Sequence, residues 1–540
     1  AASRSLALLA VTGVIALASA IDFEHSGEVS ESDVQRSLDL ELSGPGGGSQ
    51  RLQQVEASLR TTYQSLPKNA AGNLGHQAVR YVLHRLFVQR HGWFIRGLEP
   101  NNETWHDVAQ PHALSEWVPN YLQGVLEQRV GERGTNLREL AGLAASLEDL
   151  IDKEAIGRLE TAYEVHNLPR DRPITPDQAE EVLRTYYVNF LIAGNFSADS
   201  RWEAVQKTKR FASRYTGWDA ADNWLHGLLQ PRITGKTAFD FAETTRMVED
   251  IGEEYYKFND MECLELKSTL RGMEGKKPGR VRLAHFYSKS LYSHWRFTEK
   301  ADYLRVLGAL DESEPQSPQV IVSNYIMARP NCLEASHLYA ICCRNECEDM
   351  MGHLETNIGS ATAPPKRIAE LVAALPSQSD TASAPRTLSG ALLSRLDQVA
   401  ASNGGVVPLH GRLFAQWMHH AYPRECPYPH EVGSTSPQTP DEWMSQTGHK
   451  DSQASQDEMR KAVAADSCGI SWGLGGVSQP KDCGGDSELP WNANEELLQV
   501  GHAPQAAPAA AIAVPAALAA QAAPERRAAA AVVEEAAAGE

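Results

Sequence analysis

Apolar residues recur at helical spacing through most of the chain. In residues 75–91 they stand three and four positions apart, which places them on one face of a helix. These residues are Val79, Leu83, Leu86 and Phe87. Residues 137–166 repeat the pattern, with a leucine stripe surrounded by charged side chains. The pattern predicts a mainly α fold with a multi-helix body.

One helix boundary is marked by its capping residues. Thr175-Pro176-Asp177-Gln178 combines an N-cap threonine with a glutamine three positions later and a proline in the first turn. This is a capping box, in which each of the two side chains accepts a hydrogen bond from the other residue's backbone N–H. A helix is therefore predicted to begin here, after the loop that follows the helix of residues 137–166.

The N-terminal segment has the layout of a signal peptide. Residues 6–20, LALLAVTGVIALASA, follow Arg4 and end in the small residues Ala18-Ser19-Ala20. This apolar stretch is shorter than the roughly 20 residues that a membrane span needs. An uncleaved membrane anchor and a buried helix are the alternatives. The expected location is the secretory pathway, either extracellular or membrane-anchored, with membrane contact only through an uncleaved anchor.

A calcium-loop pattern follows directly. Oxygen-bearing residues stand at the spacing of loop positions 1, 3, 5, 7, 9 and 12: Asp22, Glu24, Ser26, Glu28, Ser30 and Asp33. Glu28 would contribute its backbone carbonyl, and Gly27 allows the sharp turn between ligands. Over these twelve residues the chain resembles the EF-hand family, which implies calcium as the ligand. Asp33 stands where the family usually has glutamate, so weak binding is expected. The alternative is an acidic turn.

The leader and the calcium loop are competing hypotheses. An EF-hand needs a helix before its loop, and cleavage after Ala20 would remove that helix. A helix that is apolar on all sides also differs from the amphipathic helix of an EF-hand. A cleaved leader and a complete EF-hand at Asp22 therefore exclude each other.

Two further stretches share the EF-hand outline without its ligands. Residues 167–178 have Ile174 at loop position 8, and residues 274–285 have Val281 at the same position. Unsuitable side chains stand at ligand positions: Pro169 and Gln178 in the first stretch, Lys276 and Pro278 in the second. Both stretches are predicted to be EF-hand-like helix–loop–helix pairs without calcium, by analogy of shape.

Cysteine and histidine are concentrated in residues 320–432. Residues 333–355 are predicted to form one helix that carries Cys343 and Cys347 on a common face. Cys426 follows downstream, among the histidines His410, His419, His420 and His430.

Three hypotheses fit this region. The first is a disulfide-stabilised domain in which Cys426 pairs with Cys332, Cys342, Cys343 or Cys347. The second is a zinc site built from Cys343, Cys347, Cys426 and a histidine. The third is a thiol nucleophile at Cys426, with His419 or His430 as its base. The segments RPNCLEAS, CCRNECEDMMGHLE and PLHGRLFAQWMHHAYPRECPYPH resemble an uncharacterised protist protein family of unknown function, so the resemblance implies no activity.

Composition narrows the functional classes. The 540 residues carry a formal net charge of −19, which argues against nucleic acid as a partner because phosphate binding needs a basic surface. The sequence contains no phosphate loop, dinucleotide fingerprint, zinc-protease helix or nucleophile elbow. Protein partners are not indicated. Two triplets, Asn102-Glu-Thr104 and Asn195-Phe-Ser197, are glycosylation sequons that a secreted glycoprotein would use.

The predicted organisation has six parts. They are a signal peptide or membrane anchor (1–20), an EF-hand-like loop with a Gly-rich linker (21–50), a helical domain (51–300), a Cys/His-rich helical domain (301–432), a polar linker (433–502) and a disordered Ala/Pro low-complexity tail (503–540). The expected function is that of a non-enzymatic secretory or surface protein with weak calcium binding. The alternative is a metal- or thiol-dependent enzyme that uses Cys343, Cys347, Cys426 and a histidine.

Overall fold

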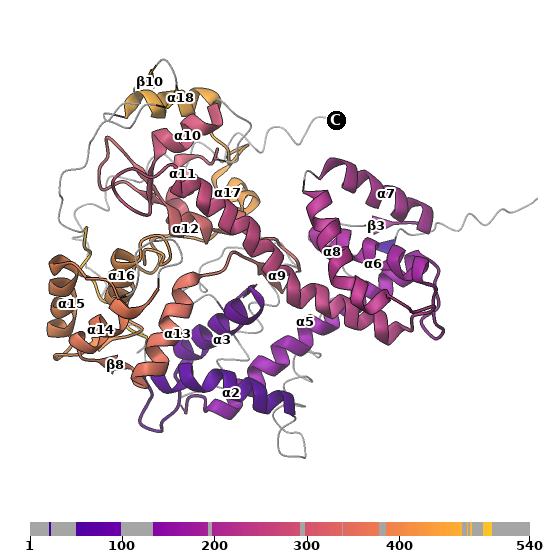
Figure 1. Cartoon of the computed structure of the whole chain (residues 1–540), viewed down its shortest axis with the longest axis horizontal. Helices are drawn as coiled ribbons and strands as arrows, with labels where there is room; N and C mark the ends of the chain where they lie inside the picture. Colours follow the sequence, from indigo (N-terminus) through magenta and orange to yellow (C-terminus); the bar gives the residue numbers. More distant parts are fainter. Residues whose placement is uncertain are drawn as a thin grey trace, which may run out of the picture. The chain divides into compact units, whose positions relative to one another are not determined.

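The mainly α fold predicted from the sequence is confirmed (Figure 1). Within the described residues the computed structural model has sixteen α-helices and only short strands. None of these helices combines the length and apolar composition needed to cross a lipid bilayer. The structure describes residues 21–22, 50–98, 133–192, 197–215, 217–291, 297–336, 338–376, 385–466, 472–473, 476–477 and 490–498.

The helices of the first half include the two longest. In chain order they are α2 (Gln50–Ser65), α3 (His76–His91), α5 (Leu137–Val165), α6 (Pro176–Leu191), α7 (Arg201–Arg214), α8 (Trp218–Ile233) and α9 (Phe241–Arg271). The predicted starts of α5 and α6 are confirmed by reciprocal capping boxes, Asn136 with Glu139 and Thr175 with Gln178. Their boundaries follow from local chemistry, because both partners of each box lie within one turn.

The helices of the second half are shorter. They are α10 (Leu283–Leu291), α11 (Ala301–Val306), α12 (Val322–Ile326), α13 (Glu346–Ile358), α14 (Pro365–Ala374), α15 (Gly390–Ser402), α16 (Arg412–Ala421), α17 (Pro440–Thr447) and α18 (Gln456–Ala465), with a 3₁₀ turn η2 (Arg329–Asn331).

The strands are two or three residues long and pair antiparallel. They are β1 (Ile21–Asp22), β2 (Trp93–Ile95), β3 (Ser197–Ala198), β4 (Arg280–Arg282), β5 (Leu310–Asp311), β6 (Gln319–Ile321), β7 (Tyr339–Ile341), β8 (Thr362–Ala363), β9 (Val407–Pro408), β10 (Trp472–Gly473) and β11 (Gly476–Val477). The pairs are β1–β3, β2–β7, β8–β9 and β10–β11, and β6 lies between β4 and β5.

Antiparallel backbone pairing joins the loops of different helix–loop–helix units in pairs. All of the paired residues except Val407 stand two or three positions before a helix: Leu74 with Thr135, Ile174 with Phe239, Glu299 with Gln453, Val281 of β4 with Val320 of β6, and Ala363 of β8 with Val407 of β9. Ile174 and Phe239 each donate their N–H to the other's carbonyl, at 2.8 and 2.9 Å. Ile174 and Val281, the residues assigned to loop position 8, both take part in this pairing.

Three hydrophobic cores lie under these helices. The first gathers buried residues of α2, α3, α5, α6 and the first half of α9 with β7. The second is formed by α13, α14, α15 and α16. The third joins the end of α9 to α10, β4, β6, α12 and α18. Cys347 and Cys426 belong to the second core, and Cys263 and Cys343 belong to the third. The cysteines therefore contribute to the packing of both cores.

The segment 433–502 differs from the polar linker that its composition predicts. It contains α17 and α18, which begin at capping boxes formed by Thr439 with Glu442 and Ser455 with Glu458. Trp443 of α17 is buried, with its ring centre 5.1 Å from that of Tyr303. A few apolar residues therefore suffice to dock two short helices in a segment of largely polar composition.

Candidate functional site

The predicted calcium loop lies mostly outside the described residues. Asp22 is described as part of β1, where it pairs with Ser197 of β3. Glu24, Ser26, Glu28, Ser30 and Asp33 are not among the described residues. The same holds for the leader, for Asn102 and Asn195 of the sequons, and for the Ala/Pro tail. The calcium site therefore stays a prediction.

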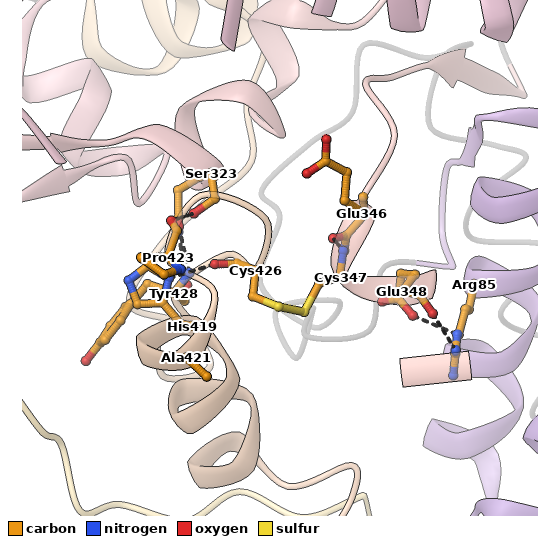
Figure 2. The surroundings of a disulfide bond; sticks show 12 residues. Arg85, Ser323, Glu346, Cys347, Glu348, His419, Ala421, Pro423, Cys426 and Tyr428 are labelled. Atoms are coloured by element: carbon orange, nitrogen blue, oxygen red, sulfur yellow. Dashed lines mark hydrogen bonds and ion pairs between the residues drawn. A yellow bond between two sulfur atoms is a disulfide. The ribbon is translucent and has the colours of Figure 1, made fainter. Parts of the chain in front are cut away.

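The six described cysteines form three disulfides. Cys347 at the start of α13 is bonded to Cys426 in the turn after α16 (Figure 2). The other two are Cys263 of α9 with Cys343, and Cys332 with Cys342. The prediction that Cys426 pairs with a cysteine of the 332–347 segment is confirmed. Cys468 and Cys483 lie outside the described residues.

The prediction of a single helix over residues 333–355 is wrong. Residues 339–341 form β7, whose partners are residues 93–95 of β2. The helix begins only at Glu346, after the Asn345 side chain accepts a hydrogen bond from the Cys347 N–H at 3.1 Å. Cys343 lies before this helix, so it does not share a helix face with Cys347. The strand pairing, with a segment far away in sequence, decides the local structure.

The disulfides determine what chemistry the cysteines can perform. A zinc ligand or a nucleophile must be a thiolate. Cys343, Cys347 and Cys426 are all disulfide-bonded, and Cys343 is joined to a different partner from the other two. Either the zinc or the thiol alternative would first require reduction of these bonds. Within the described ranges, no three His, Cys, Asp or Glu side chains are grouped to hold a metal ion.

The His419 ring forms its hydrogen bond to the backbone carbonyl of Cys426 and not to the sulfur of that residue. The Cys426 carbonyl points to His419, while its Sγ is turned toward Cys347 (Figure 2). His419 Nδ1 lies 2.7 Å from that carbonyl, and Nε2 lies 3.0 Å from Arg280 Nη1. Because a carbonyl only accepts, Nδ1 carries the proton and Nε2 accepts from Arg280. Burial, helped by the charge of Arg280, holds the pKa of His419 well below its ordinary value.

The other histidines of the region have separate partners. His420 Nε2 lies 2.9 Å from the carbonyl of Pro490, and His430 Nε2 lies 2.7 Å from that of Gly308. His410 Nε2 lies 2.8 Å from Glu355 Oε1. The histidines that lie close together in the sequence therefore do not form a common site, because each ring has a different hydrogen-bond partner.

A buried ion-pair network joins the first core to the second, and the sequence did not reveal it. Arg85 of α3 contacts Glu348 Oε2 through Nε at 2.6 Å and Glu355 through Nη1. Both carboxylates belong to α13, and Glu355 also accepts from His410. The Arg85–Glu348 contact lies beside the Cys347–Cys426 bond (Figure 2). Buried charges need partners of opposite charge, and here Arg85 of α3 is the partner of both glutamates of α13.

The network shifts the ionisation of its carboxylates in opposite directions. Burial alone would raise the pKa of Glu355, but the hydrogen bond from His410 and the charge of Arg85 outweigh it and lower the pKa. Burial raises the pKa of Glu348, and Arg85 compensates only in part. The network therefore contains one firmly ionised carboxylate, that of Glu355, and one that is harder to ionise, that of Glu348.

Comparisons with protein-family models, with curated proteins and with solved structures find no match to this chain. A mainly α fold class does not by itself define a function.

Proposed function

We propose that this chain is a disulfide-stabilised, helical protein of the secretory pathway. It acts by binding rather than by catalysis and takes up calcium weakly through residues 22–33. The three disulfides are the observation that supports a location in the secretory pathway. Such bonds form and persist in oxidising compartments and are rare where glutathione keeps thiols reduced.

The helix pairs support the kinship behind the calcium proposal. In an EF-hand pair, the residues at loop position 8 connect the two loops through the backbone. Ile174 and Val281 were assigned that position from spacing alone, and both form antiparallel pairs with another loop. These loops lack ligands, so the resemblance is one of shape. The loop at residues 22–33 combines the same spacing with oxygen-bearing side chains.

Calorimetry with calcium on the full chain tests the proposal. We expect binding in the weak range, with a Kd on the order of 10⁻⁴ to 10⁻³ M. The double variant Asp22→Asn/Glu24→Gln removes two ligand charges and should abolish the heat of binding.

A matched control comes from the look-alike loop. Asp171→Asn changes the same chemical group in residues 167–178, where the ligand set is incomplete, and should leave calcium binding unchanged. Absence of heat from the unsubstituted chain contradicts the proposal. Equal heat from the unsubstituted chain and the double variant places any calcium elsewhere.

A further inference from the structure

Arginine, histidine and phenylalanine side chains gather beside the β2–β7 pair. The guanidinium carbon of Arg329, in η2, lies 5.1 Å from the ring centre of Phe94 in β2. The ring of His84, from α3, meets the same phenylalanine edge to face, with 4.9 Å between ring centres. The η2 turn, far away in sequence, and the nearby helix α3 therefore meet at one aromatic ring of β2.

Two arginines of this group share one carboxylate. Glu334 Oε1 lies 2.7 Å from Arg329 Nη2, and Glu334 Oε2 lies 2.5 Å from Arg96 Nη2. Two positive groups and one negative group leave an excess positive charge of one on these three side chains. Arginine does not lose its proton in proteins, so deprotonation cannot remove this charge. One carboxylate shared by two guanidiniums compensates only part of their charge, and buried charge that is not compensated is costly, which favours a further anion.

The same group contains buried donors without acceptors. The Arg329 side chain is 7% exposed, and its Nη1, which carries two N–H groups, has no hydrogen-bond partner. Arg96 Nε is a second buried donor without a partner, and His84 Nδ1, which donates in the tautomer protonated there, also lacks one. Among the arginines that the structure describes, Arg329 is the one with a terminal nitrogen in this condition. Buried donors normally find an acceptor, so these point to a missing one.

His84 is suited to donate a hydrogen bond without adding charge. Burial, followed by the neighbouring charge of Arg80, lowers its pKa to about 4. The ring is therefore neutral near pH 7, and one of its nitrogens carries a proton.

A rigid frame holds these donors in place. The Cys332–Cys342 disulfide closes the turn that follows Arg329, and Leu333 pairs with Ile341 inside that turn. The Arg96 N–H donates to the Leu338 carbonyl at 3.0 Å. Arg96 and Glu334 remain 22% and 23% exposed, so the edge of the group reaches solvent, while the unpartnered nitrogens lie buried behind it. Donors fixed before binding lose little freedom when a ligand arrives.

We propose that Arg329, together with Arg96 and His84, forms a binding site for the oxyanion group of a small ligand. A guanidinium presents parallel N–H groups that match two oxygens of a carboxylate, a phosphate or a sulfate. The three anions share the chemistry that the site recognises. This site is independent of the calcium loop and uses other residues.

Calorimetry of the full chain, freed of calcium by passage over a chelating resin, tests the site. Inorganic phosphate, sulfate and acetate are titrated separately, and the strongest of the three identifies the oxyanion class. We expect saturable binding in at least one titration. Arg329→Gln should weaken it about tenfold or more, as expected for the loss of a hydrogen bond to a charged group. Because calcium has been removed beforehand, failure of the calcium proposal leaves this result unaffected.

Arg344→Gln is the matched control, since Arg344 lies in the same cysteine-rich stretch, is 43% exposed and pairs with Asp349. It should leave the affinity unchanged. If Arg329→Gln does not fold, Arg96→Gln replaces it, because the Arg329–Glu334 pair is then retained and the affinity should still fall. Absence of saturable binding at millimolar anion overturns the proposal, since the charge would then be met within the chain. Equal weakening by Arg344→Gln overturns it as well.

Discussion

Removal of the Cys347–Cys426 bond should destabilise the second core more than removal of the Cys332–Cys342 bond destabilises its own turn. The test uses two double variants, Cys347→Ala/Cys426→Ala and Cys332→Ala/Cys342→Ala. Alanine is preferred to serine because a buried hydroxyl without a partner would add its own cost.

The expected magnitudes follow from the length of chain that each bond closes. The separations are 79 residues for Cys347–Cys426 and 10 for Cys332–Cys342. The chain-entropy relation gives about 4.5 kcal/mol for the first and about 2.7 kcal/mol for the second. The first loss should be concentrated in α13 to α16, because both of its cysteines belong to that core.

Hydrogen exchange followed by mass spectrometry is a suitable assay, since a chain with three cores need not unfold in one step. A loss of about 4.5 kcal/mol corresponds to roughly three orders of magnitude in the exchange protection of α13 and α16. Helix α5, in the first core, serves as the internal control and should change much less. The reasoning is refuted if protection in α13 and α16 is unchanged, or if the Cys332/Cys342 variant proves the more destabilised.

Two further variants test buried positions. Burial raises the pKa of Glu299 to about 7, so its contribution to stability is present at acidic pH and is lost as the pH rises through about 7. Glu299→Gln should remove up to about 3 kcal/mol of that pH dependence, and equal melting profiles from about pH 5 to 8 would contradict this. Gly279 has φ +71°, and a Cβ there would collide with the carbonyl of Pro423, so Gly279→Ala should cost at least about 2 kcal/mol by denaturant titration. Gly404→Ala, also at positive φ but with open space around it, should cost less, and equal losses would show that the collision is unimportant.

Elements fixed by local chemistry were predictable from the sequence. Helices α3 and α5 begin and end within a residue of their predicted limits, and α6 begins where its capping box predicts, because apolar periodicity and capping boxes act within a few turns. The same reasoning could have found α17, since Thr439-Pro440-Asp441-Glu442 repeats the pattern of Thr175–Gln178. The polar composition around it outweighed that local evidence.

Elements fixed by distant partners were not predictable. Residues 339–341 form a strand because they pair with residues 93–95, and the sequence around either segment does not identify the other as its partner. Arg85 stands in an apolar stretch of α3, but its role depends on Glu355, 270 positions further along. The cysteine pairing was narrowed to four partners for Cys426, and tertiary structure selects Cys347.

Mapping of disulfides and free thiols in the native protein, by mass spectrometry without reduction, tests the central claim most directly. The account predicts that the Cys347 and Cys426 peptides are cross-linked to each other, that the peptide with Cys342 and Cys343 is bonded to both Cys332 and Cys263, and that no thiol is free at these six positions. Free thiols at Cys343, Cys347 and Cys426, with zinc found by elemental analysis, would contradict it and favour a metal- or thiol-dependent enzyme.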